Sequence, residues 1–268
     1  MGKTKLSFLH AGFNHTILAP CRVNSPEIRI KLKHTITFYC LCMAVLFLSW
    51  KPIAKADRNT EKTAPAIIGK PSSAVNTKIH SLYLSLELKE MGLSEDAFSY
   101  AYKGYEVLLQ KKLVAKEGYL TICDFSQSST KKRLYVIDMV NQSVVVNTYV
   151  AHGKNSGGEF ARYFSNRSGS LQSSLGFYVT KQTYYGEHGL SLRMAGLEKG
   201  INDKAYRRAI VIHGADYIGN RQKGRSFGCP AVPKQESSRI INTIKNGHCL
   251  FIYHPSKKYL QGSKILND

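Results

Sequence analysis

Acidic residues are scarce in this chain: its 268 residues contain 18 Asp and Glu against 38 Lys and Arg, a formal charge of +20. The first 56 residues hold eight Lys or Arg and one acidic residue, Glu27, so the remaining 30 basic and 17 acidic residues leave +13. Such an imbalance favours an anionic partner, which includes nucleic acid, a membrane surface and a carboxylate-rich polymer. Charge alone does not choose among these three.

Repeats and clustered metal ligands are also missing. The sequence contains no internal repeat, no low-complexity tract and no C-x-x-C or H-x-x-x-H cluster. A zinc site needs three or four ligands, so zinc is a minor alternative that would depend on the scattered His152, His188 and His248. We therefore expect no cofactor and no metal.

The chain lacks an apolar run of the roughly 20 residues that a membrane-spanning helix needs. Its longest run, TITFYCLCMAVLFLSW, follows the basic stretch RIKLKH and precedes Ala54-Lys55-Ala56. This layout is typical of a secretory signal peptide with cleavage before Asp57. We expect residues 1–56 to be a signal peptide with an over-long front end, and the mature protein to act in the periplasm or cell envelope. An uncleaved membrane anchor is the alternative.

Removal of that leader leaves three of the six cysteines, an odd number that implies at least one free thiol. Cys123 and Cys249 lie in the strand-like runs YLTICDF and HCLFIY, where we expect them to be buried or paired. Cys229 lies in a glycine-rich loop instead. An exposed thiol in an exported protein is open to oxidation, so its presence there indicates a function.

Composition changes along the chain indicate a helical lead-in followed by a β-rich domain. Residues 57–76 have the polar, Pro- and Ser-containing composition of a linker. Helical periodicity over 77–91 and 94–112, with Ser94 as N-cap, predicts a lead-in over 77–115. Residues 116–268 then show at least six short β-branched or aromatic runs and one helix near 234–246. We predict a mainly β (α+β) domain, with a mainly antiparallel sheet, over 116–268.

The stretch RAIVIHGADYIGNRQKGRSFGCPAVP carries a histidine and a cysteine in a pattern that suits acyl transfer. A buried strand ends at His213 and Gly214, and the loop that follows can fold back to bring Cys229 near His213. A thiol becomes a nucleophile when a neighbouring imidazole or cation, here His213 or Arg225, favours the thiolate. Gly228 leaves room for an acyl group, and the backbone N–H groups of Gly228 and Cys229 are candidate oxyanion donors.

At this point the residues carry a resemblance to a known family. VIHGADY with GRSFGCPAV, together with VAHGKNSG, FSNRSGSLQSSLGFY and YYGEHGLSLRMAGLEKGIND, resembles the YkuD-like L,D-transpeptidases, in particular the divergent murein L,D-transpeptidase catalytic domain branch. The resemblance spans about 120–255. It implies a β-sandwich or barrel with Cys229 as nucleophile, His213 as base, and the main-chain carbonyl of Gly214 orienting the imidazole.

The chain departs from the commoner family pattern on both sides of the cysteine. Phe227 stands where many relatives have a second histidine, and Pro230 follows the cysteine directly. We therefore expect other residues to bind the substrate carboxylate, although each of these arginines is equally explained as a solvated charge. The candidates for substrate binding or for shaping the loop are Arg225, Arg193, Arg221, His152, Tyr217 and Ser226. For His152 a structural role is the stronger alternative.

By resemblance, the enzyme acts on peptidoglycan stem peptides, forming 3-3 crosslinks or exchanging the terminal D-amino acid of a tetrapeptide. An L,D-carboxypeptidase or endopeptidase on the same stems is the alternative within this chemistry. A non-catalytic wall-binding module conflicts with the presence of both Cys229 and His213, and a papain-type peptidase with their order in the chain. Export argues against nucleic acid as partner. We expect a monomer that works close to the membrane.

Overall fold

The computed structural model describes residues 73–115, 118–218 and 225–267. The predicted signal peptide and most of the predicted linker lie outside these residues. The last four residues of that linker belong to a helix, α2, which begins at Ser73. Within the described ranges, no helix combines the length and the apolar character that a membrane crossing requires.

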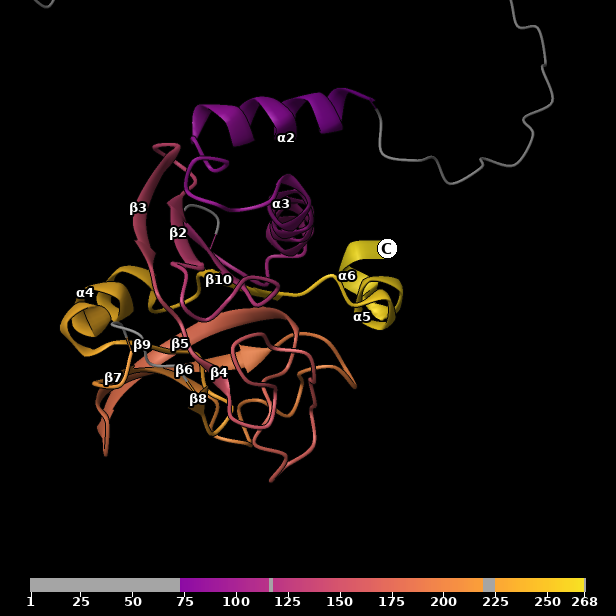
Figure 1. The fold of residues 1–268 in the computed structure, drawn as a ribbon. Coiled ribbons are helices and arrows are strands. Elements are labelled where there is room, and N and C mark those ends of the chain that lie inside the picture. Colours follow the sequence, from indigo (N-terminus) through magenta and orange to yellow (C-terminus); the bar gives the residue numbers. More distant parts are fainter. Residues whose placement is uncertain (1–72, 116–117, 219–224, 268) are drawn as a thin grey trace, which may run out of the picture. The chain divides into compact units, whose positions relative to one another are not determined.

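An eight-stranded sheet forms the centre of the fold, in the order β3-β2-β1-β10-β5-β6-β7-β9 (Figure 1). A separate short pair, β4 with β8, lies beside the end of this sheet's sequence of loops. The strands are β1 (Tyr119–Asp124), β2 (Leu134–Asp138), β3 (Ser143–Thr148), β4 (His152–Gly153), β5 (Gly176–Gly186), β6 (Gly189–Gly196), β7 (Val211–Ala215), β8 (Arg225–Ser226), β9 (Ala231–Pro233) and β10 (Cys249–Tyr253).

The sheet confirms the predicted mainly β fold and its mainly antiparallel pairing. Two neighbouring pairs are parallel: β1 with β10, and β7 with β9. The central strands β2, β7 and β10 are buried along their whole length, because their continuous β-branched and aromatic runs are covered on both faces. Cys123 in β1 and Cys249 in β10 are buried and unpaired.

Five helices surround the sheet: α2 (Ser73–Ser85), α3 (Glu95–Gln110), α4 (Lys234–Ile244), α5 (Lys257–Gly262) and α6 (Lys264–Asn267). Helix α3 begins as predicted, because Ser94 accepts a hydrogen bond from the N–H of Ala97 at 3.2 Å. It packs on β1 and β10, whereas α4 packs on β6, β7 and β9 (Figure 1). The lead-in therefore contributes directly to the core of the sheet.

Some boundaries differ from the prediction. Helix α2 ends at Ser85 rather than near Met91, and Gly92, at φ +86°, closes a turn instead of the helix. Strand β6 and the short helices α5 and α6 were not predicted. Glycines at both ends of GLSLRMAG hid the strand, and helices of six or four residues carry too little periodicity to be recognised.

A glycine in α3 allows that helix to approach the sheet closely. Gly104 faces the ring of Phe177 in β5, which stacks on Phe251 of β10 with 4.1 Å between ring centroids. A Cβ added to Gly104 would lie 2.0 Å from Phe177 Cζ. The stacked pair sits in the middle of a close-packed core, so neither ring can move aside cheaply.

We expect Gly104→Ala to lower the free energy of unfolding by about 1–3 kcal/mol, because overpacking outweighs the helix propensity that alanine adds. Denaturant titration measures the change. The matched control is Gly262→Ala in α5, where no atom lies within 4 Å of the added Cβ, and this variant should unfold at the same or a higher denaturant concentration. Unchanged stability of Gly104→Ala would contradict this account of the α3 packing.

Candidate active site

His213 lies in the middle of the sheet, on the row of side chains that β5, β6 and β7 share. Tyr184 in β5 is opposite Ser191 in β6, and Ser191 is opposite His213 in β7. Directly paired residues of antiparallel strands point to the same face. The three side chains therefore line one wall of a pocket, and His213 is only 4% exposed.

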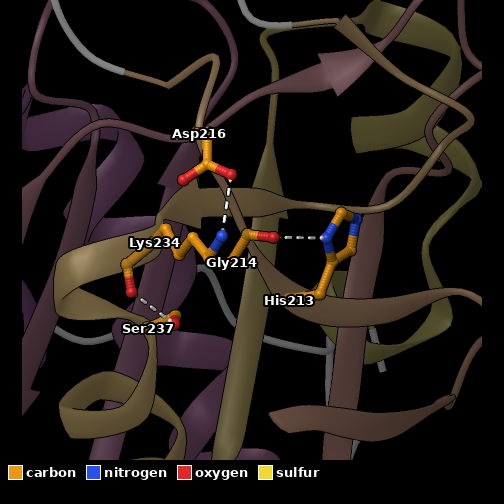
Figure 2. Close-up of polar contacts among 5 residues, drawn as sticks. All are labelled: His213, Gly214, Asp216, Lys234 and Ser237. Atoms are coloured by element: carbon orange, nitrogen blue, oxygen red, sulfur yellow. Dashed lines mark hydrogen bonds and ion pairs between the residues drawn. The ribbon is translucent and has the colours of Figure 1, made fainter. Parts of the chain in front are cut away.

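The carbonyl of Gly214 orients the His213 ring. His213 Nδ1 lies 3.0 Å from this oxygen (Figure 2). A carbonyl only accepts, so Nδ1 carries the proton and the Nε2 lone pair is left available to accept another. The Gly214 role that the family resemblance implies thus has the geometry it requires.

Helix α4 explains why residue 214 is a glycine. A Cβ at this position would lie 2.6 Å from Ser237 Oγ and 3.1 Å from the Cα of Lys234. The first turn of α4 presses directly on the β7 backbone, and the Lys234 ammonium contacts Asp216 at 2.8 Å to join helix and loop (Figure 2). The carbonyl that holds His213 is in turn held by this packing.

A second histidine covers the His213 ring. His188, from the exposed turn between β5 and β6, stacks on His213 with 4.2 Å between centroids and 21° between planes. Burial is the main cause that lowers the pKa of His213 below its ordinary value of 6.5, and His188 lowers it further, against the opposing effect of the Gly214 contact. His213 is therefore neutral at pH 7, the state that a general base requires.

Cys229 is held beside β7 by the parallel pairing of β9. The Val211 N–H donates to Cys229 Sγ at 3.5 Å, and Sγ lies 3.8 Å from the carbonyl oxygen of Ala209. Burial raises the pKa of the Cys229 thiol, and the Val211 N–H and the positive charge of Arg208 partly offset this. The thiol is half-buried and protonated at neutral pH.

The turn that carries the cysteine is shaped by Ser226. Its hydroxyl accepts the Gly228 N–H at 3.1 Å and donates to the Cys229 carbonyl. Ser226 therefore fixes the loop, which is one of its two predicted roles, and its hydroxyl is already used. The same contact corrects one prediction: the Gly228 N–H is not free for an oxyanion. Among the hydrogen bonds of the described residues none engages the Cys229 N–H, which keeps that donor available.

Cys229 and His213 line the same pocket, whose volume is about 460 Å³. No hydrogen bond of the described residues joins them, contrary to the expected contact. The reason is register: Cys229 lies beside Val211, two residues before His213, and two residues of strand span about 7 Å. Catalytic hydrogen bonds often form only in the substrate complex. The pocket is lined by Tyr184, Gly186, Glu187, His188, Ser191, Arg208, Ala209, Ile210, Val211, His213, Tyr217, Ser226, Phe227 and Cys229.

Two of the predicted substrate-binding residues lie at the pocket. Tyr217 lines it and is 36% exposed. Arg193 is opposite Val211 in the β6–β7 register, and its guanidinium lies 4.3 Å from the centre of the Tyr184 ring, which forms part of the wall. Arg193 thus borders the pocket without lining it.

The prediction that His152 contacts substrate is wrong, and the structural alternative holds. His152 is fully buried, and its Nδ1 lies 2.8 Å from Nη2 of the equally buried Arg133. Its strand β4 pairs with β8, so it supports the loop from behind. The Arg225 backbone belongs to β8, whereas its side chain and all of Arg221 lie outside the described part of the structure.

Sequence reasoning missed two residues of the site, His188 and Arg208. His188 was considered only as a scattered zinc ligand, and nothing in GEHG signals that its ring reaches His213. Arg208 precedes the catalytic strand next to Arg207, and the sequence does not distinguish the two arginines. Among the described residues, no three His, Cys, Asp or Glu side chains group closely enough to hold a metal ion.

The sequence matches a known family over most of the described fold. The family is the L,D-transpeptidase catalytic domain, and the match covers residues 89–253, more than half of the chain. No curated protein matches. The matched range includes α3, the whole sheet and α4.

Three solved structures that match the chain at low identity are L,D-transpeptidases. One from Mycobacterium smegmatis is 10% identical, with 52% of this chain aligned to 59% of that one and a TM-score of 0.34. L,D-transpeptidase 3 from Mycobacterium tuberculosis is 8% identical over 52% and 62%, with a TM-score of 0.36. The third, from Xylanimonas cellulosilytica, is 14% identical over 76% and 100%, with a TM-score of 0.33. The chain spans about three fifths of the two mycobacterial proteins.

We expect the His213 ring to titrate below 6.5 in NMR spectra of the folded protein. His188→Ala removes a ring that shields His213 from water and disfavours its protonation, so the His213 midpoint should move upward. The control His80→Ala, at an exposed position on α2, should leave the midpoint unchanged. A His213 midpoint that stays or falls in His188→Ala would contradict the inferred effect of the stack.

Proposed function

Because the chain belongs to the L,D-transpeptidase catalytic domain family, we propose that it is a peptidoglycan L,D-transpeptidase in which Cys229 forms an acyl-enzyme. The membership confirms the resemblance drawn from the motifs, and with it the YkuD-like fold. The observation that carries the proposal is the pocket in which a protonated thiol and a neutral, oriented imidazole face the same space.

The first half-reaction breaks the peptide bond that follows the third residue of a tetrapeptide stem. Nε2 of His213 accepts the thiol proton, and the Cys229 sulfur attacks the carbonyl carbon of the diamino acid. A thioester forms as the C–N bond breaks, and His213 returns the proton to the departing nitrogen of the terminal D-alanine. Charge is conserved, because the cycle begins and ends with a neutral pair.

The second half-reaction transfers the acyl group to an amine. The side-chain amine of another stem attacks the thioester, His213 accepts its proton, and the sulfur leaves as a thiolate that takes the proton back. The product is a 3-3 crosslink. A free D-amino acid in place of the stem gives exchange, and water gives carboxypeptidase activity, by the same steps.

The proposed proton transfer requires the sulfur to approach His213. The two weak contacts of Sγ, with the Val211 N–H and the Ala209 carbonyl, lie at 3.5 and 3.8 Å, so rotation about the Cys229 χ1 bond gives up little. In our proposal, substrate entering the pocket displaces the thiol toward Nε2. The Cys229 N–H then stabilises the oxyanion, because the Gly228 N–H is already bonded to Ser226.

We assign the substrate carboxylate to Arg193. Its guanidinium is half-buried on the Tyr184 ring at the pocket rim, and no carboxylate neutralises it among the described ion pairs. Arg225 is the second candidate. The excess of basic residues agrees with a partner rich in carboxylates, and the proposed setting is the cell envelope, reached through the leader at 1–56.

We expect Cys229→Ala to abolish product formation from tetrapeptide muropeptides, measured by mass spectrometry, with circular dichroism unchanged. The matched control is Cys123→Ala, which removes a buried thiol outside the pocket and should keep turnover. Undiminished turnover by Cys229→Ala would end the acyl-enzyme proposal. The same spectra distinguish dimer, tripeptide and exchanged product, and so identify the reaction subtype.

We expect Arg193→Met to raise KM for tetrapeptide donors by about 10- to 100-fold with little change in kcat, because a hydrogen bond to a charged group contributes about 1.5–3 kcal/mol. The control Arg239→Met, on the exposed side of α4, should leave both constants unchanged. An unchanged KM in Arg193→Met would transfer the carboxylate site to another cation.

A further inference from the structure

Arg208 joins two segments that are far apart in sequence and that meet at the nucleophile. Its Nη1 donates to the Ser165 carbonyl at 2.8 Å and to Ser174 Oγ at 2.6 Å. Its Nη2 donates to the Gln172 carbonyl at 2.8 Å and to Ser170 Oγ at 3.2 Å. One guanidinium therefore fastens both ends and the middle of an irregular segment, 165–174.

That segment lies directly on the turn that carries Cys229. Ser173 Oγ donates to the Gly228 carbonyl at 3.2 Å. A Cβ on Gly228 would lie 3.0 Å from the Gln172 carbonyl oxygen and 3.6 Å from Arg208 Nη2, and Gly228 has φ +122°, which favours glycine. The backbone before the nucleophile is thus packed against a segment that has no regular secondary structure of its own.

We propose that Arg208 is a positioning residue for the reaction: it fastens the 165–174 segment, the segment holds the Gly228–Cys229 turn, and its positive charge stands beside the nucleophile. All four Nη hydrogens are used by the protein, so Arg208 does not bind substrate through them. This separates it from Arg193 at the pocket rim. The bearing on turnover rests on the proposed function, whereas the geometry and the thiol chemistry do not.

The charge has a defined effect on Cys229. Burial raises the pKa of the thiol, and Arg208 acts in the opposite direction by favouring the thiolate. No carboxylate cancels the Arg208 charge among the ion pairs of the described residues. Loss of the charge should therefore decrease the thiolate fraction, while loss of the hydrogen bonds alone should not.

Four variants of the full chain separate the two tasks. Arg208→Gln removes the charge, and Arg208→Lys keeps it but offers one ammonium in place of a four-bond fork. The double variant Ser170→Ala/Ser174→Ala keeps the charge and removes two of the partners of Arg208. The matched control Arg207→Gln removes the charge of the neighbouring exposed arginine.

The first measurement is the rate of Cys229 alkylation by iodoacetamide as a function of pH, followed by peptide mass spectrometry. We expect Arg208→Gln to react about tenfold more slowly than the wild type at pH 7, because a cation within contact range shifts a neighbouring pKa by about one unit or more. Arg208→Lys, the double variant and Arg207→Gln should keep the wild-type pH profile. Equal profiles for Arg208→Gln and the wild type would overturn the role of the charge.

The second measurement is amide hydrogen exchange in the peptide that spans Gly228 and Cys229. We expect exchange to become about tenfold faster in Arg208→Lys and in the double variant, because each loses hydrogen bonds worth about 0.5–1.5 kcal/mol. Unchanged exchange in the double variant would overturn the positioning role, and it decides the matter even if Arg208→Gln fails to fold. Neither measurement needs peptidoglycan, so a wild type without transpeptidase activity would refute the proposed function and leave this inference standing.

Discussion

The parallel pairing of β7 with β9 brings the ends of a long loop to adjacent positions, and the pocket depends on it. His213 ends up opposite Ala231, and Cys229, two residues earlier, lies beside Val211. The pairing itself is secured from the other side of the sheet by α4, which presses on Gly214 so closely that no side chain fits there. The base and the nucleophile thus share one rigid support.

Burial sets the chemistry of this pair. It raises the pKa of Cys229 and lowers that of His213, so the resting state is a thiol and a neutral imidazole rather than an ion pair. Reactivity then depends on a proton transfer that substrate binding must promote. In a protein exposed to oxidants, a resting thiol is less easily oxidised than a thiolate.

Much of the fold and the core of the site followed from local patterns. Buried strands were recognisable because β-branched residues are continuous in them, and His213 and Cys229 because each ends a strand-like run beside glycines. His152 was misjudged, because a histidine after a strand looks the same whether it faces a pocket or a buried cation such as Arg133. Arg208 and His188 escaped notice because their contacts lie 20 or more residues away in sequence.

Residue types along the chain by themselves determined the β-rich class, the α3 cap at Ser94 and the identity of the reacting pair, since these depend on neighbours within a few positions. Only the tertiary structure decided the distance between sulfur and imidazole, the engagement of the Gly228 N–H, and the cation beside the thiol. Those properties come from strand register and from contacts between distant segments, and a shift of two residues in register moves a side chain by about 7 Å without altering the local pattern.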